Sequence, residues 1–193
     1  IYQIISSYNK IKKNLSLKTY KNLSYFEILT LTALEIFKSI HCQVIILEIG
    51  LGGRLDACNA VNPIASIITS IAFDHKEYLG HTLKLITQEK LGICRQNAPL
   101  FWGHVKQNDE ASQTMINYTK IYNIKAYIRD KHFGFDRKQN FIWSINYEKK
   151  LKNLKIGLSE TFINPALFHK ENFSLAYTCY NWIQKNHQDL TLK

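Results

Sequence analysis

The stretch that decides the fold runs from Ile46 to Asn59 and reads ILEIGLGGRLDACN. It contains the end of an apolar run, Gln43 to Ile49, which has the length of a β-strand. Continuous apolarity indicates a strand buried on both faces, as in a parallel sheet covered by helices. The run contains one carboxylate, Glu48, and three glycines, Arg54 and a second carboxylate, Asp56, follow directly. This composition favours a tight loop at the strand end, where α/β proteins bind ligands.

Helix-like and strand-like segments alternate around this stretch. Residues 25–40 carry apolar side chains at helical spacing, and Ser24 to Glu27 fits the capping box S-x-x-E. Strand-like segments at 64–72, 99–103 and 125–128 then alternate with helix-like segments at 82–95, where Thr82 is a plausible N-cap, and at 107–122. The alternation predicts an α/β fold with a mostly parallel sheet flanked by helices.

The pattern changes in the last third of the chain. Residues 131–157 read as short alternating strands, which predicts a small antiparallel β appendage. Residues 170–188 return to a helix, with one side formed by Phe173, Ala176, Tyr177 and Tyr180. At 193 residues the chain is long enough for one substantial core.

Composition and charge exclude several classes of protein. No apolar run of about eighteen residues occurs and residues 1–14 lack a secretory core, so we expect no membrane partner. Four scattered cysteines without a C-x-x-C pair favour reduced thiols in the cytoplasm over a zinc ribbon. The net charge of +10 comes from scattered lysines, so a basic nucleic-acid-binding domain is only the weaker alternative.

Two predicted strands end in groups that bind cations. Glu48 follows the first apolar run, and Asp74 and His75 follow the segment 64–72. A carboxylate at the end of a buried strand is a common Mg²⁺ ligand in nucleotide-handling proteins. The alternatives are that Glu48 caps a helix or pairs with Arg54, and that His75 is an ordinary packed or surface histidine, since Mg²⁺ prefers oxygen.

The loop from Gly50 to Asp56, the glycine loop, is not a dinucleotide fingerprint. G-x-G-x-x-G requires a glycine where Leu55 stands and a helix directly afterwards, whereas Pro63 follows and no helical stripe is present. Lys90 is a second unusual residue, because it lies in the apolar register of the helix 82–95. Such a lysine usually extends outward to water, but a buried amine has a lowered pKa and can react as a free base.

Two motifs together carry a family resemblance. The first is EIGLGGRLDACN, from Glu48 to Asn59, and the second is TSIAFDH, from Thr69 to His75, followed by YLG at 78–80 and QEKLGI at 88–93. In order, content and spacing, residues 22–103 resemble folylpolyglutamate synthase and dihydrofolate synthase, of the Mur ligase superfamily. The resemblance implies that residues 1–193 are part of the P-loop-type, ATP-binding central domain of such a ligase, with 131–157 as an insertion.

The resemblance also implies roles for individual residues. Glu48 and His75 match Mg²⁺ ligands, and Lys90 matches a lysine carbamylated by CO₂. Asn172 resembles an asparagine that contacts adenine. Two segments match the pterin-binding site, namely Ser24, Tyr25, Phe26 and Glu27, and then Leu55, Asp56 and Ala57.

The implied reaction joins L-glutamate to dihydropteroate or a folate through an acyl phosphate made with ATP. No phosphate loop G-x-x-x-x-G-K-[ST] occurs in the sequence, the first residue is Ile1 instead of Met, and the family's C-terminal domain is not recognisable. We therefore expect an incomplete, monomeric part of the enzyme that does not turn over ATP alone. The alternative is a non-catalytic remnant of such a ligase.

Overall fold

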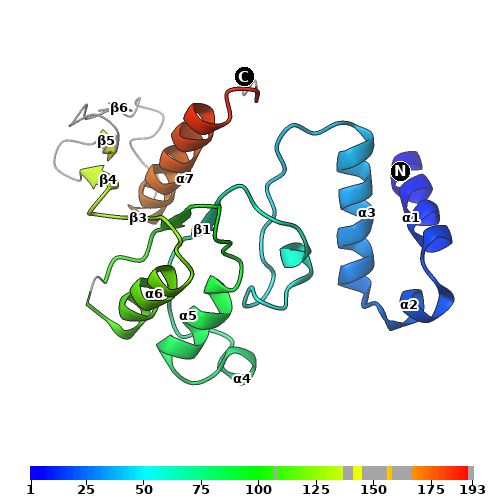
Figure 1. The fold of residues 1–193 in the computed structure, drawn as a ribbon, viewed down its shortest axis with the longest axis horizontal. Helices are drawn as coiled ribbons and strands as arrows, with labels where there is room; N and C mark the ends of the chain where they lie inside the picture. Colours follow the sequence, from blue (N-terminus) through cyan, green and yellow to red (C-terminus); the bar gives the residue numbers. More distant parts are fainter. Residues whose placement is uncertain (107, 137–140, 145–155, 158–166, 191–193) are drawn as a thin grey trace.

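The computed structural model describes residues 1–106, 108–136, 141–144, 156–157 and 167–190. Three helices, α1 (Tyr2–Asn14), α2 (Leu17–Asn22) and α3 (Tyr25–Ser39), form a unit at one end of the molecule (Figure 1). α1 packs along α3, and the Lys10 ammonium pairs with the Glu35 carboxylate between them. The chain then crosses through a long irregular segment to an α/β unit at the other end.

The α/β unit is built on a parallel sheet in the order β1 (Ser66–Ile68), β2 (Leu100–Trp102) and β3 (Ala126–Ile128). On one face, Ile68, Leu100 and Trp102 pack in a core with α5 (Leu83–Leu91) and α6 (Glu110–Ile121). On the other face, Phe101 and Tyr127 pack against α7 (Leu167–Asn186) (Figure 1). The predicted parallel sheet flanked by helices is confirmed.

The antiparallel appendage is also confirmed. β4 (Phe133–Asp136), β5 (Phe141–Ser144) and β6 (Ile156–Gly157) form a second sheet with antiparallel pairing, and β4 packs against α7. Residues 137–140 and 145–155 of the predicted appendage lie outside the described residues. On α7 the rings of Phe173, Tyr177 and Tyr180 do follow one side, but the buried positions are Ser174, Leu175, Thr178 and Cys179.

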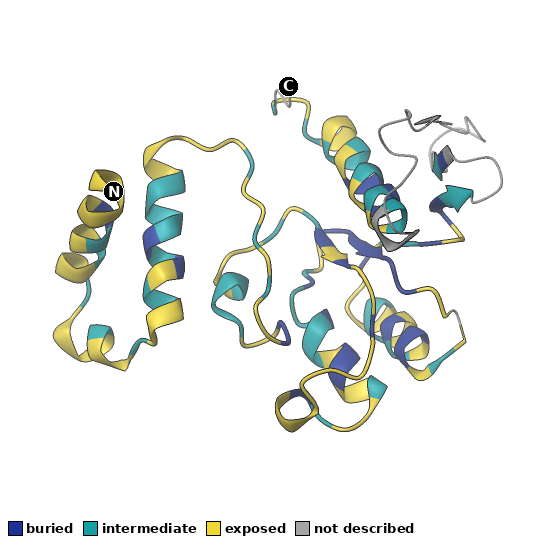
Figure 2. Cartoon of the chain, turned by 180° about the vertical axis from the view of Figure 1, so that it is seen from behind, coloured by how far each residue is buried: buried dark blue, intermediate teal, exposed yellow. Residues whose placement is uncertain are grey.

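The predicted strand at Gln43 to Ile49 is wrong for the described residues. The segment forms no strand, and none of its residues is buried. Ile46 is 92% exposed. Figure 2 shows the exposed and intermediate colours along the irregular segment after α3. An apolar run becomes a central strand only when neighbours supply both a hydrogen-bond ladder and cover for both faces, and no described strand pairs with it. The strand predicted at 64–72 is shorter, β1, and the helix predicted at 82–95 ends at Leu91.

Helix boundaries follow the local capping chemistry. The Thr82 hydroxyl accepts the backbone N–H of Leu85 at 3.2 Å, as predicted for the start of α5. Asp109 caps α6 through the N–H of Ser112 at 2.9 Å. None of the helices in the described ranges combines the length and apolarity that a membrane crossing requires.

Candidate functional site

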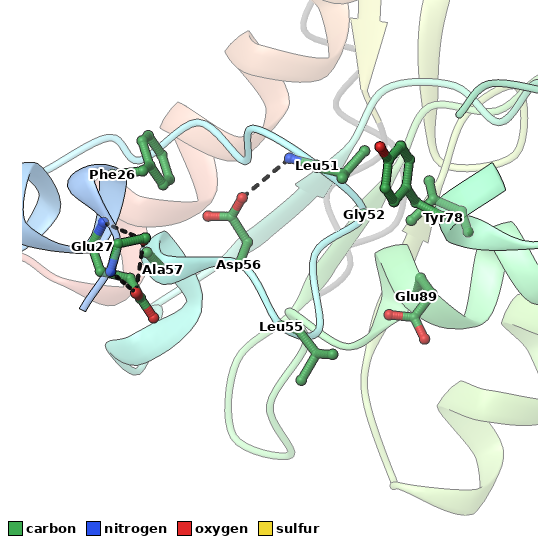
Figure 3. A pocket seen from close by; sticks show the side chains of 11 residues that line it. Phe26, Glu27, Leu51, Gly52, Leu55, Asp56, Ala57, Tyr78 and Glu89 are labelled. Carbon is green, nitrogen blue, oxygen red and sulfur yellow. Dashed lines mark hydrogen bonds between the residues drawn. The ribbon is translucent and has the colours of Figure 1, made fainter. Parts of the chain in front are cut away.

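A cleft of about 380 Å³ opens where α3, the glycine loop, the short helix α4 (Lys76–Leu79) and α5 meet (Figure 3). Its walls are Ser24, Phe26, Glu27, Leu51, Gly52, Leu55, Asp56, Ala57, Tyr78, Leu79 and Glu89. Six of the seven residues predicted to contact a pterin are in this set, although they come from two separate segments of the sequence. The seventh, Tyr25, is not a lining residue.

The capping box of α3 forms one wall of the cleft. Glu27 Oε2 accepts the backbone N–H and the hydroxyl of Ser24, both at 2.7 Å, and the Ser24 hydroxyl accepts the N–H of Glu27 at 3.3 Å. The Ser24 hydroxyl, followed by its backbone N–H, lowers the pKa of the Glu27 carboxyl. The wall therefore presents a fixed anion, and the prediction of a capping box at these residues is confirmed.

Asp56 organises the glycine loop. Its Oδ2 accepts the N–H groups of Gly50 and Leu51 at 3.0 and 3.1 Å, and its Oδ1 accepts the N–H of Cys58 at 2.8 Å. Figure 3 shows the bond to Leu51. The last bond starts the single turn η1 (Ala57–Ala60). Asp56 thus holds both ends of the loop and still faces the cleft.

The loop rests on the end of α5. Gly53 has a φ of +151°, and a Cβ there would lie 2.9 Å from the carbonyl oxygen of Glu89. The N–H of Arg54 donates to that carbonyl at 2.9 Å, and the Arg54 guanidinium contacts Glu89 Oε1 at 3.0 Å. Arg54 therefore pairs with Glu89, and the described residues show no ion pair between Arg54 and Glu48.

Arg95 and Asn59 connect the same two segments. The Arg95 guanidinium donates to the Asn59 carbonyl and side-chain oxygens at 3.1 and 2.9 Å, and to the Gly92 carbonyl at 3.1 Å. The Asn59 amide donates to the carbonyls of Arg54 and Gly92, both at 3.1 Å. This network fixes the loop against the helix that carries Glu89 and Lys90.

The two predicted metal ligands are both accessible. Glu48 is exposed, and the side chain of His75 is 55% exposed with Nε2 at 3.5 Å from Asp74 Oδ2. His75 has a left-handed backbone, φ 46°, and is the N-cap residue of α4. In the part of the chain that the structure describes, no three His, Cys, Asp or Glu side chains gather as a metal site. The exposed Glu48 carboxylate suits Mg²⁺, which prefers oxygen ligands and keeps several waters, whereas the His75 imidazole is not a ligand that this ion prefers.

Lys90 and Asn172 lie in different parts of the molecule. Lys90 is half-buried on α5, next to the fully buried Leu91 and one turn after the fully buried Ile86. Asn172 is exposed on α7, which covers the opposite face of the sheet from α5. The structure therefore brings Lys90 to the neighbourhood of the cleft, through Glu89, but not Asn172.

Sequence reasoning missed Tyr78 and Glu89 as walls of the cleft. Both are in motifs quoted for the resemblance, YLG and QEKLGI, so the motif itself was the available signal. It also missed the buried His104 at the end of β2. His104 Nδ1 accepts the N–H of Ile71 at 3.2 Å, so its proton is on Nε2, which donates to Asp109 Oδ2 at 2.7 Å.

Comparisons with known proteins agree with the motifs. No family model matches the chain. The dihydrofolate synthase/folylpolyglutamate synthase of Haemophilus influenzae is 40% identical over 135 residues, which are 69% of this chain and 30% of that protein. The protein of the same name from Escherichia coli is 49% identical over 82 residues, 42% of this chain and 19% of that protein.

The fold gives the same answer. A solved structure of Escherichia coli FolC in complex with ADP is 29% identical, has a TM-score of 0.72 and covers 93% of this chain and 40% of that one. The chain spans less than a third of the length of the two curated relatives from Haemophilus influenzae and Escherichia coli. By sequence and by fold, the chain is related to the dihydrofolate synthase and folylpolyglutamate synthase family over the part of those proteins that it spans.

Proposed function

We propose that this chain provides the pterin-binding part of an ATP-dependent ligase that joins L-glutamate to dihydropteroate or to folates. The observation that carries the proposal is the convergence of six of the seven residues predicted for pterin contact on one cleft. The relatives named dihydrofolate synthase/folylpolyglutamate synthase support it, as does the solved FolC structure that contains ADP. In this proposal residues 1–193 belong to the ATP-binding central domain.

The chemistry of the cleft suits a flat, uncharged heterocycle. Its walls combine apolar side chains such as Phe26 and Leu55 with the carboxylates of Glu27, Asp56 and Glu89. Carboxylates accept N–H donors, which the amino group and ring N–H of a pterin supply. Neither lysine nor arginine is among the described lining residues, so the anionic glutamate tail and the ATP phosphates lie outside this cleft.

The remaining residues have roles outside the cleft. Glu48 and His75 would hold Mg²⁺, which offsets the charge on the ATP phosphates. Lys90, on the same helix as Glu89, would be the carbamylated lysine. Because all four cysteines are free thiols, we place the protein in the cytoplasm, and we propose that it is a monomer that binds neither nucleic acid nor membrane.

Calorimetric titration with dihydropteroate tests the proposal directly. We expect saturable binding with one site per chain, and weaker binding by Phe26→Ala, because this change removes an aromatic wall. A chain with native circular dichroism that binds no pteroate would refute the proposed function.

Turnover separates binding from catalysis. No phosphate loop motif is present in the 193 residues, so we expect no ADP release by this chain even when pteroate is bound. Mg²⁺-dependent ADP release, measured by a coupled assay, would contradict this expectation.

A further inference from the structure

We infer that Tyr78 is a second aromatic wall of the cleft and that its ring stacks on the flat ring system of the ligand. The inference rests on the proposed function and assigns a residue to which the family motifs gave no role. Tyr78 comes from α4 and Phe26 from α3, and the two side chains lie on opposite sides of the glycine loop (Figure 3).

The Tyr78 ring is free to accept a ligand. Tyr78 is 75% exposed. Its ring makes no hydrogen bond or aromatic contact with any other described residue. Phe26 is 47% exposed on the other side, and Leu55 is 80% exposed below them. Exposed apolar side chains from separate segments that surround one cleft mark a ligand site, because a flat ligand would remove all of them from water.

The backbone that carries Tyr78 is held in place. α4 is a single turn in which the N–H groups of Tyr78 and Leu79 both donate to the carbonyl of His75, at 2.9 and 3.0 Å. Leu79 is only 8% exposed and packs under the loop, since a Cβ on Gly52 would lie 2.8 Å from Leu79 Cδ2. Leu79 therefore anchors the turn from below while its neighbour Tyr78 faces the cleft.

The pair of aromatic walls narrows the class of ligand. Exposed aromatic walls favour a conjugated, planar ring system, because stacking depends on a flat π-face. The Glu27 carboxylate, whose bonds to Ser24 use only Oε2, can then accept an N–H donor at the ring edge. The pterin ring of a pteroate satisfies both conditions, whereas an aliphatic ligand of the same volume offers no flat face to stack on.

The test is a calorimetric titration with dihydropteroate of three variants and the unchanged chain. Tyr78→Ala should bind roughly twofold to tenfold more weakly, the range that corresponds to one aromatic stacking contact. Tyr78→Phe should bind like the unchanged chain, because it keeps the ring. Tyr2→Ala, which removes an 86% exposed tyrosine on α1, is the matched control and should have no effect.

The outcomes separate this inference from the proposed function. If the unchanged chain binds no pteroate, both fail. If it binds and Tyr78→Ala binds equally well, only the role of Tyr78 is overturned. Equal weakening by Tyr78→Phe and Tyr78→Ala would assign the contact to the hydroxyl group and would also overturn the aromatic wall.

Discussion

Replacing Gly53 by alanine should destabilise the protein far more than the same change at Gly50. Gly53 has a φ of +151°, and a Cβ there would lie 2.8 Å from Ile93 Cγ2, 2.9 Å from the Glu89 carbonyl oxygen and 3.2 Å from that of Lys90. A strained backbone costs about 1–3 kcal/mol and overpacking against fixed atoms about 1–3 kcal/mol. The free energy of unfolding should therefore fall by about 2–6 kcal/mol, a large share of the roughly 5–15 kcal/mol of a typical domain.

Gly50→Ala is the matched control, in the same loop. Gly50 has no positive φ, and the nearest atom to an added Cβ is Asp56 Oδ2 at 3.4 Å, an ordinary contact. We expect a change of less than about 1 kcal/mol, as for most substitutions outside the core. Urea unfolding followed by tryptophan fluorescence measures both variants. The precision of the method is roughly 0.5 kcal/mol. If the free energies of unfolding of the two variants differed by less than this, the close packing of this loop on α5 would be refuted.

Three further predictions concern Arg95, Asp109 and Cys94. Arg95→Ala should lower the free energy of unfolding by about 2 kcal/mol, since Asn59 loses its charged partner, and urea unfolding would show it. Burial raises the pKa of the Asp109 carboxyl, but hydrogen bonds from Ser112 and His104 outweigh burial, and the net pKa is lowered. The ionised carboxylate therefore stabilises the fold above about pH 4. This stabilisation is lost as the pH falls through the lowered pKa. Asp109→Asn should therefore lose less stability between pH 7 and pH 3 than the unchanged chain. Burial raises the pKa of Cys94 to about 12, so a thiol reagent should modify the exposed Cys42 first and Cys94 only after unfolding.

Much of the candidate site was predictable because its parts are local or belong to one motif. The capping box of Ser24 and Glu27 joins residues three apart, so no distant contact is needed to form it. The glycine loop likewise closes on itself through Asp56. By contrast, Tyr78 and Glu89 enter the cleft only because α4 and α5 pack against the loop, and spacing along the sequence carries no information about that approach.

The sequence by itself determined most of the alternation of helices and strands, the helix caps and the segments proposed to bind ligand, because these depend on periodicity and on bonds between near neighbours. Only the tertiary structure decided that Gln43 to Ile49 remains outside the described sheet, that Arg54 pairs with Glu89 and that Asn172 lies across the sheet from α5. Each of these depends on which surfaces far apart in the chain meet. Burial and hydrogen-bond ladders arise from such meetings, and a pattern of apolar residues indicates only the capacity for them.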